Sequence, residues 1–359
     1  MEQTVKKERR VRIGITHGDM NGISYEIIIK TLQDQRLMEL YTTVVYGSSK
    51  VASYHRKSLN INEFNFNLVK KADQAHPHRP NIINIHDEEV KIDLGKSTAI
   101  AGELALLSLE AACDDLMKNN IDVIVTAPIN KKNIQAPGFA FAGHTEYFAQ
   151  KFNADNPLML MVNNVLRIGV VTGHIPLGKV KEALTTELIL NKIQVMNQSL
   201  LRDFGIVKPR IAILALNPHA SDEGLIGNEE KTIIQPAIEK AYNQNILAFG
   251  PYPADGFFGA TSFKNFDGIL AMYHDQGMVP FKLMSFDEGV NFTAGLPVIR
   301  TSPAHGTAYD LAGKNEASPE AFRNALYLAA DIFMHRLEYD ELHENQLRPA
   351  GGQNENNRS

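Results

Sequence analysis

The sequence of 359 residues contains a single cysteine and no tryptophan, and its charged residues leave a formal net charge of −5. The single cysteine, Cys113, excludes an internal disulfide and any metal site built from thiolates, and it favours a reducing compartment, the cytoplasm. The acidic balance argues against nucleic acid as a partner, because it implies no broad basic surface. No apolar run long enough for a signal peptide or a membrane span follows the charged N-terminus, so no membrane contact is expected.

Two common nucleotide-binding fingerprints, G-x-G-x-x-G and Walker A, are also absent. A bound nucleotide would therefore need another mode of binding. The first predicted strand ends in THGDMNGISYE, where Gly18 and Gly22 flank Asp19 and Asn21. Such a turn could let the backbone approach a ligand closely, because glycine has no side chain and tolerates unusual backbone angles.

Short runs rich in β-branched residues alternate with longer helical stretches, a pattern typical of βαβ units and a largely parallel sheet. The clearest helix signal follows Ser318, which is placed as the N-cap with Pro319 at the first helical position. Apolar residues then recur at helical spacing from Phe322 to Phe333 and predict a core-facing helix. Strands are predicted at residues 11–16, 42–46, 121–126, 158–162, 166–172, 210–216 and 268–273.

Three strand-like runs in the middle of the chain end in a histidine: VLRIGVVTGH at His174, RIAILALNPH at His219 and GILAMYH at His274. The carboxyl ends of parallel strands meet at one edge of a sheet, so three imidazoles placed there could share one metal ion. Each histidine alone could equally be an ordinary polar residue that starts a loop. The repetition favours a metal centre. Zn²⁺ suits three nitrogen ligands best, with Mg²⁺, Co²⁺ or Mn²⁺ as alternatives.

Two loops carry groups suited to an anion. The strand that ends at Thr126 opens into TAPINKK, where Lys131 could bind an anion or be a solvated lysine at the loop edge. The segment GHTEYFAQKF begins with Gly143, His144 and Thr145 just before a helical pattern, where free backbone N–H groups attract anions. Thr145 could instead be the N-cap. His144 precedes a helix and does not end a strand, so we place it on the substrate.

The stretch from residue 272 to residue 313 holds more polar candidates than any other part of the chain. We predict that it is rich in loops, because glycine and proline recur throughout it. Ordering such a loop costs backbone entropy that burial of small residues does not repay, so it usually serves a site. Its polar candidates are His274, Asp275, Lys282, Asn291, Arg300 and His305.

Nine motifs occur in an order and with a spacing that resembles the 4-hydroxythreonine-4-phosphate dehydrogenase family of pyridoxal phosphate biosynthesis. They extend from about Ile13 to about Arg336, nearly the whole chain. The last motif also looks like the adenine-side cofactor loop of isocitrate and isopropylmalate dehydrogenases. The motifs are THGDMNGISYE, TAPINK, GHTEYFA, TGHIPLGKV, LNPHASDEGLIGNEE, YPADGFF, YHDQG, VNFTAGLPVIRTS and HGTAYDLAG.

The resemblance implies an enzyme that uses NAD or NADP to oxidise 4-phosphohydroxy-L-threonine at its C3 hydroxyl and then decarboxylates the product to 3-amino-2-oxopropyl phosphate. It implies one divalent metal per site, held by His174, His219 and His274. It also implies a homodimer with a shared cleft, in which one histidine could serve the neighbouring chain's metal. The remaining implied roles are substrate binding by His144, Thr145, Lys282, Asn291 and Arg300, cofactor binding by Gly18, Asp19, His305 and Gly306, and catalysis by Asp275 and Lys282.

The fold implied by the resemblance is α/β, with two α/β/α domains of the isocitrate and isopropylmalate dehydrogenase type and the active site in the cleft between them. The first domain is expected to comprise residues 1–137 and 304–345. Residues 138–303 are expected to form the second domain, on the metal and dimer side. Residues 346–359 lack apolar periodicity and are rich in Asn, Gln and Gly, which predicts a disordered tail.

Two loops depart from the family pattern. In the first loop, Ser24 and Tyr25 replace the usual glycine and proline, and Ser221, Asp222 and Glu223 stand where members usually have Gly-Glu-Gly. These departures leave open a related substrate such as 4-phospho-D-threonate or 4-phospho-D-erythronate. A non-catalytic protein that binds metal and a phosphate ligand is the alternative of another class. The cofactor-loop motif, the cations suited to phosphate and the three metal histidines are all present together, which argues against this alternative.

Overall fold

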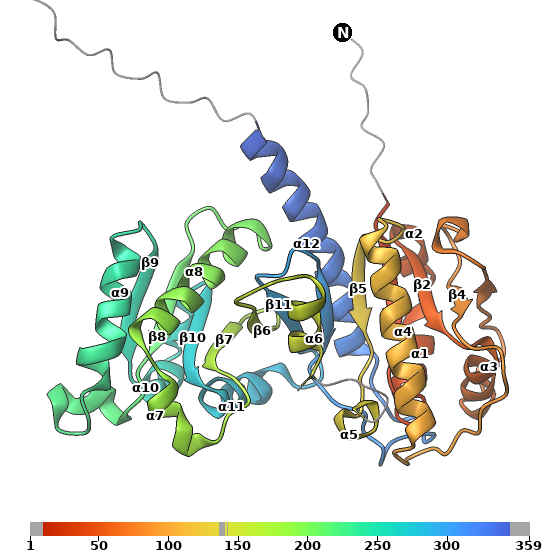
Figure 1. Cartoon of the computed structure of the whole chain (residues 1–359), viewed down its shortest axis with the longest axis horizontal. Helices are drawn as coiled ribbons and strands as arrows, with labels where there is room; N and C mark the ends of the chain where they lie inside the picture. Colours follow the sequence, from red (N-terminus) through yellow and green to blue (C-terminus); the bar gives the residue numbers. More distant parts are fainter. Residues whose placement is uncertain (1–9, 136–140, 142, 345–359) are drawn as a thin grey trace, which may run out of the picture.

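The computed structural model describes residues 10–135, 141 and 143–344. Within these residues twelve strands form one sheet in the order β3-β4-β2-β1-β5-β12-β11-β6-β7-β10-β8-β9 (Figure 1). The sheet is largely parallel, as predicted, and only the pairings of β11 with β6 and β12 and of β6 with β7 are antiparallel. The strands are β1 (Arg12–Thr16), β2 (Thr42–Gly47), β3 (Asn67–Leu68), β4 (Asn81–Asn84), β5 (Val123–Thr126), β6 (Leu158–Val162), β7 (Arg167–Thr172), β8 (Arg210–Leu214), β9 (Leu247–Tyr252), β10 (Gly268–Tyr273), β11 (Val290–Ala294) and β12 (Arg300–Pro303).

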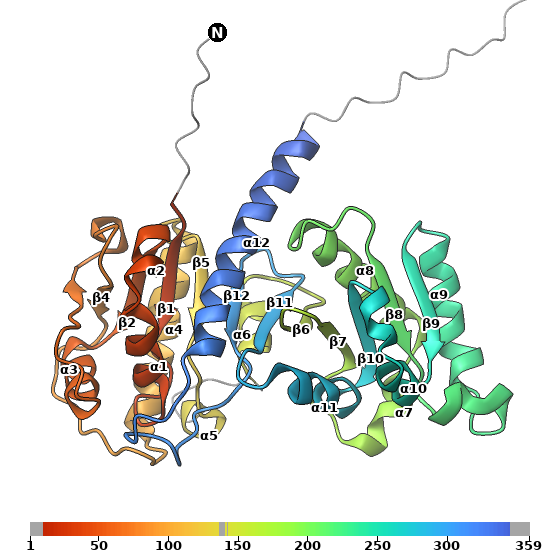
Figure 2. The same ribbon diagram turned by 180° about the vertical axis from the view of Figure 1, so that it is seen from behind.

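Helices cover both faces of this sheet, which confirms the predicted α/β class (Figures 1 and 2). Successive residues of a strand point to opposite faces, so Val44 packs in one apolar cluster and Val45 in another. The helices are α1 (Ser24–Leu32), α2 (Gln35–Leu40), α3 (Ser49–Ser58), α4 (Ala99–Met117), α5 (Lys131–Ile134), α6 (His144–Lys151), α7 (Val180–Ala183), α8 (Thr186–Arg202), α9 (Gln235–Tyr242), α10 (Ala254–Gly259), α11 (His274–Ser285) and α12 (Glu320–Glu344).

The apolar core is continuous on one face of the sheet and divided on the other. On the first face one cluster joins Ile13 of β1 to Phe322 of α12 and to Ile211 of β8. On the opposite face one cluster surrounds Val44 and a separate one surrounds Ala212. The first face therefore holds the two halves of the molecule together, and the second face leaves room for polar residues between its two clusters.

The prediction that residues 272–313 are rich in loops is wrong over much of its length. Residues 274–285 form α11, and β11 and β12 follow it. The glycine in α11 has a local packing reason. A Cβ on Gly277 would lie 2.8 Å from Ile168 Cγ2, so this glycine lets the helix approach the sheet closely. Pro280 lies inside the helix.

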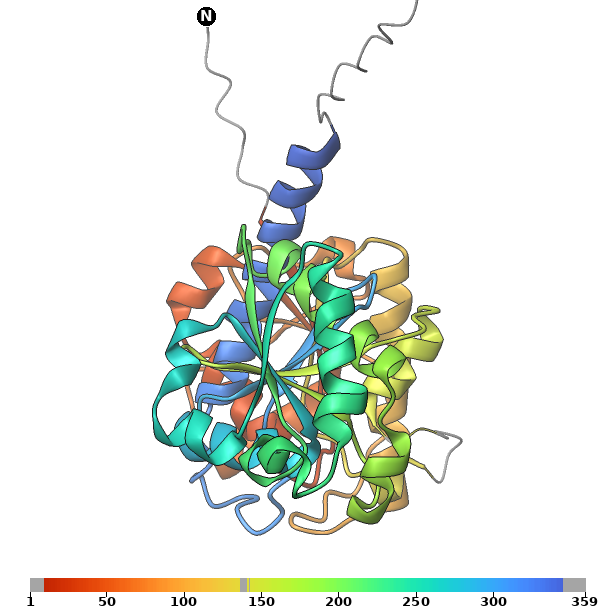
Figure 3. The same cartoon turned by 90° about the vertical axis from the view of Figure 1, so that its left-hand side faces the viewer.

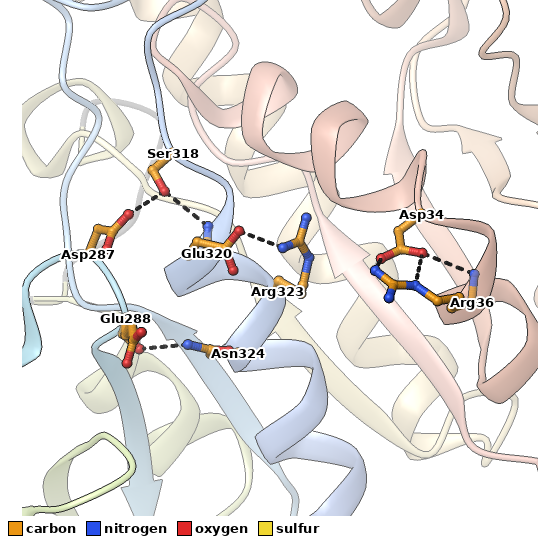
Figure 4. A network of polar contacts seen from close by, with 8 residues as sticks. All are labelled: Asp34, Arg36, Asp287, Glu288, Ser318, Glu320, Arg323 and Asn324. Atoms are coloured by element: carbon orange, nitrogen blue, oxygen red, sulfur yellow. Dashed lines mark hydrogen bonds and ion pairs between the residues drawn. The ribbon is translucent and has the colours of Figure 1, made fainter.

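The start of α12 is anchored by a network of polar side chains (Figure 4). Ser318 acts as the predicted cap, because its Oγ accepts a 3.3 Å hydrogen bond from the Glu320 amide. The same hydroxyl donates to Asp287 Oδ2 over 2.5 Å, and the Asn324 side chain donates to the Glu288 carbonyl over 3.2 Å. The loop that follows α11 is therefore fixed to α12.

The remaining predictions from the sequence concern Cys113, membrane-spanning helices, the two domains and the C-terminal tail. Cys113 is a buried free thiol. No helix in the described part of the chain is long and apolar enough to cross a membrane. The division into two domains stays a prediction, because one sheet runs through both halves, and the boundary at residue 137 and the tail at 346–359 lie outside the described residues. The last turns of α12 project from the body of the molecule (Figure 3).

Candidate functional site

A cavity of about 260 Å³ lies between the two apolar clusters of the divided face. Strands β6, β11 and β12, the segment that follows β5, and helices α6 and α11 all contribute to its walls. Most of the side chains predicted to bind substrate or metal line it. Its polar lining comprises Lys131, Gly143, His144, Thr145, Glu146, His174, His274, Lys282, Asn291, Arg300, Ser302, His305 and Gly306.

Arg300 forms the buried end of the cavity, where only 2% of the residue is exposed. Its Nε and Nη2 donate to Thr126 Oγ1 over 3.0 and 2.7 Å, and Nη2 also donates to His144 Nδ1 over 3.0 Å. Because an arginine can only donate, His144 Nδ1 must be the acceptor and its proton must sit on Nε2. This Nε2 is buried and has no hydrogen-bond partner in the described part of the chain.

Burial dominates the electrostatics of this end. It lowers the pKa of Arg300 to about 9, and it lowers the pKa of His144 well below the usual value, with the charges of Arg300 and Lys131 adding to the effect. Among the described residues no carboxylate forms an ion pair with the Arg300 guanidinium. A buried cation without a paired anion is costly. The buried end is therefore suited to receive an anion from solution.

The start of α6 and β11 add further donors and acceptors. Gly143 is the N-cap of α6, so the alternative role of Thr145 as the N-cap is wrong. Thr145 lies in the first turn, where backbone N–H groups lack helical partners. Asn291 Oδ1 and His305 Nε2 are buried without partners in the described part of the chain. Unsatisfied buried polar atoms around one cavity indicate a ligand site.

His174 and His274 form the exposed end of the cavity, and their ring centroids lie 5.5 Å apart. His274 Nδ1 lies 2.7 Å from Asp275 Oδ1, which places the proton on Nδ1 and leaves Nε2 free as an acceptor. Asp275 itself does not line the cavity, whereas Lys282, two turns along α11, does. A histidine pair with one carboxylate behind it is a common arrangement for part of a metal site.

The third predicted histidine, His219, does not join this pair. Strands β7, β10 and β8 are adjacent and parallel, so all three histidines leave the sheet at the same edge, as predicted. However, His219 does not line the cavity, and no three metal-binding side chains of the described residues form a cluster within one chain. The backbone from His219 to Glu223 is left-handed at five successive residues, so from His219 onward the loop does not continue the extended direction of the strand.

Two side chains that the sequence analysis did not single out fix the strand ends beneath these histidines. Gln276 accepts a 2.7 Å hydrogen bond from the Met272 amide and donates a 2.6 Å bond to the Ala215 carbonyl, so it bridges β10 and the end of β8. Glu230 accepts hydrogen bonds of 2.8 and 2.7 Å from the backbone amides of Leu216 and Asn217, which follow β8. Only their positions in the YHDQG and GNEE motifs could have indicated these roles.

The predicted cofactor residues fall into two groups. Gly18 has a φ of +64°, and a Cβ there would lie 2.3 Å from the Pro128 carbonyl oxygen. Asp19 is fully buried and accepts hydrogen bonds of 2.7 to 2.8 Å from the Asn21 amide, Asn133 and the Tyr309 hydroxyl. These two residues do not line the cavity, and Asp19 ties the first loop to the HGTAYDLAG loop. His305 and Gly306 do line it.

Tyr25, a departure from the family pattern, lies in the core beside the first loop. Its ring stacks between His17 and His55, with centroid distances of 5.3 and 5.2 Å. Its hydroxyl accepts a 2.9 Å hydrogen bond from the Ser48 amide. Burial lowers the pKa of both histidines to about 4. The substitution therefore changes core packing and leaves the lining of the cavity unaltered.

The family model for the pyridoxal phosphate biosynthetic protein PdxA matches residues 39–329 of this chain. A 4-hydroxythreonine-4-phosphate dehydrogenase of Bacteroides thetaiotaomicron is 49% identical over 343 residues, covering 95% of this chain and 94% of that protein. A protein of the same name from Sulfurihydrogenibium sp. is 40% identical over 319 residues, covering 89% and 97%. The crystal structure of the Klebsiella pneumoniae 4-hydroxythreonine-4-phosphate dehydrogenase gives a TM-score of 0.79 at 33% identity, covering 90% of this chain and 100% of that chain.

Proposed function

The chain belongs to the PdxA family of pyridoxal phosphate biosynthetic proteins, and from this premise we propose a metal-dependent dehydrogenase that uses NAD or NADP. It oxidises 4-phosphohydroxy-L-threonine at C3 to 2-amino-3-oxo-4-phosphohydroxybutanoate, which loses CO2 to give 3-amino-2-oxopropyl phosphate. The observation that carries this proposal is a buried, unpaired guanidinium at one end of a cavity whose other end presents two histidines. The cavity thus offers separate places for an anionic group and for the reacting alcohol.

The buried end would hold an anionic group of the substrate. Arg300 supplies a planar donor whose other contacts, Thr126 and His144, are neutral, and His144 offers the Nε2 proton. Asn291, with a free buried Oδ1, would orient a donor of the substrate such as its amine. Thr145 and Lys282 line the same cavity and would complete the grip on phosphate and carboxylate.

His174 and His274 fit a divalent cation, because both line the cavity with their rings 5.5 Å apart and the Asp275 contact leaves His274 Nε2 free. Their nitrogen donors favour Zn²⁺. When bound there, such an ion supplies Lewis-acid stabilisation of the substrate oxygen during oxidation and decarboxylation. Asp275 would hold the ring of His274 in orientation, and Lys282 would deliver or accept a proton at the substrate.

The third ligand would be His219 of a second copy, in a homodimer with shared sites. The loops that carry His174 and His219 each expose large apolar side chains. Leu177 is 73% exposed, three residues beyond His174, and Leu225 is 84% exposed, six residues beyond His219. Burial of such side chains stabilises an interface between subunits. A second chain docked on these loops would bring a His219 toward the partner's histidine pair.

The nicotinamide cofactor would bind beside the HGTAYDLAG loop. His305 and Gly306 line the cavity, and Gly306 leaves open space where a Cβ would stand. Gly18 and Asp19 would act by holding the first loop against this one, since Asp19 bonds Tyr309 directly. We place the enzyme in the cytoplasm, where its single free thiol would remain reduced.

The test is an assay of NADH or NADPH formation by the purified full chain. The substrates are 4-phosphohydroxy-L-threonine, 4-phospho-D-threonate and 4-phospho-D-erythronate, each with NAD and NADP, before and after chelation and metal re-addition. We expect turnover of the first substrate, loss after chelation and recovery with Zn²⁺. Preference for one of the other phosphates would reassign the substrate, and metal binding without turnover of any of them would leave only the non-catalytic alternative.

A further inference from the structure

We propose that Lys131 is a substrate-binding cation, which contacts the phosphate of the substrate together with the first turn of α6. The inference rests on the proposed function for the identity of the phosphorylated ligand. Lys131 is the first residue of α5 and lines the cavity with His144 and Thr145. Its Cε and Nζ lie 3.7 and 4.0 Å from the position that a Cβ on Gly143 would take, and Glu146 Oε2 lies 3.5 Å from the same position. Gly143 is the N-cap of α6, so the ammonium lies at the N-terminal end of that helix.

Positive charge exceeds negative charge around this position. The N-terminus of a helix carries a partial positive charge, which repels an ammonium and attracts an anion. The buried guanidinium of Arg300 lies behind His144 at the same end of the cavity. The charge of Lys131 reaches His144 and helps to lower its pKa. Three positive features therefore converge on one region in which Glu146 supplies the one carboxylate among the described lining residues, and an anion bound there would balance the positive charge that remains.

The charges that line the cavity match a phosphate. Lys131, Lys282 and Arg300 are its three cationic side chains apart from histidine, and Glu146 is the one carboxylate among the described lining residues. Their sum is about +2, and a phosphate monoester carries about −1.5 to −2 at neutral pH. A carboxylate alone would leave this excess of positive charge unbalanced.

The neighbouring residue provides a matched control. Lys132 is also exposed and lies on the same short helix, but it does not line the cavity. If Lys131 were only a solvated lysine of the loop, removal of either charge would have the same effect. If Lys131 binds the substrate, only its own removal will weaken binding.

The experiment compares Lys131→Ala, Lys131→Arg and Lys132→Ala in the full chain. For Lys131→Ala we expect a KM for 4-phosphohydroxy-L-threonine raised about 10- to 100-fold with kcat changed less than about threefold, because a contact made equally in the ground and transition states affects KM alone. Lys131→Arg should recover most of the loss, and Lys132→Ala should match the wild type. Equal KM values for Lys131→Ala and Lys132→Ala would overturn the inference.

A second measurement separates this inference from the proposed function. Inorganic phosphate should raise the unfolding midpoint of the wild type and of Lys132→Ala in the absence of cofactor, and raise that of Lys131→Ala distinctly less. The midpoint without phosphate should not fall in Lys131→Ala, since a cation at a helix N-terminus does not stabilise the fold. If the wild type turns over none of the tested alcohols, the proposed function fails, but a phosphate response that depends on Lys131 would still support the inference. An identical phosphate response in all variants would overturn it.

Discussion

The two ends of the cavity differ in how completely one chain builds them. At the buried end, Arg300 is 2% exposed and is held by Thr126 and His144 within hydrogen-bond distance. At the exposed end, the His274 side chain is 39% exposed, and it lies beside His174 without a third metal ligand among the described residues of the same chain. Folding of one chain therefore assembles the proposed anion site, whereas the proposed metal site would need His219 of a second copy as its third ligand.

The largest expected effects come from the exposed end. His274→Ala and His219→Ala should each lower kcat by at least about 1000-fold and abolish stoichiometric Zn²⁺ binding, because each removes a ligand that the site cannot replace. The unfolding midpoint of the metal-free protein should change little, since both side chains are exposed or partly exposed. Metal content and kcat are the measurements.

A mixture of these two inactive variants tests the sharing of the site between chains. If His219 acts in the partner's site, a hybrid dimer contains one intact site and one doubly altered site. Random exchange of subunits should then restore about a quarter of the wild-type activity. No recovery after verified subunit exchange would contradict the shared site and would leave the exposed end with two histidines.

At the buried end, Arg300→Lys should lower kcat/KM by about 100- to 1000-fold, because lysine cannot keep two donors on Thr126 and a third contact on the substrate. Unlike the histidine variants, this change should also lower the unfolding midpoint, since the side chain is fully packed. Arg36→Lys, at an 84% exposed side chain, is the matched control and should behave like the wild type. A normal kcat/KM for Arg300→Lys would remove the anion role from this residue.

A smaller effect is expected for the residue behind the metal ligand. Asp275→Asn should weaken Zn²⁺ affinity by about 10- to 100-fold, because the amide no longer accepts strongly from His274 Nδ1. Asp155→Asn, at another exposed carboxylate, is the control. Zn²⁺ affinity is measured by competition with a chelator, and activity at saturating metal should recover most of its wild-type value. An unchanged affinity would show that Asp275 does not orient the ring.

The sequence predicts the two ends of the cavity unequally, for physical reasons. Three hydrophobic runs that end in histidine predict that β7, β10 and β8 end at one edge of the sheet. The structure has these strands adjacent and parallel. The left-handed loop at His219 could not be predicted, because five successive non-glycine residues adopt a backbone that costs about 1–2 kcal/mol each. Glu230 fixes the segment just before it, through the amides of Leu216 and Asn217.

The antiparallel strands beside the buried end were missed for a related reason. β12 is the four-residue segment RTSP, which ends in a proline, and β11 follows a helix that contains Pro280. Local propensity argues against a strand in either segment, so the sequence predicts loops there. Pairing of β12 with β5 and β11 nevertheless forms the strand and places Arg300 beside Thr126. Sequence reasoning could name Arg300 as an anion ligand, but it could not find Thr126 or the protonation state of His144.

The smallest predicted effect concerns pH and separates buried from exposed histidines. His17 and His55 have pKa values lowered to about 4 by burial, so between pH 6.5 and 4 the unfolded chain binds protons that the folded chain does not. Stability is therefore lost as the pH falls through this window, by up to about 1.4 kcal/mol per pH unit for each histidine. His55→Gln, whose amide can still donate to the Met20 carbonyl, should move the acid-unfolding midpoint to lower pH. The exposed His78→Gln should leave it unchanged, and equal shifts in the two variants would contradict the assignment of acid sensitivity to the buried stack.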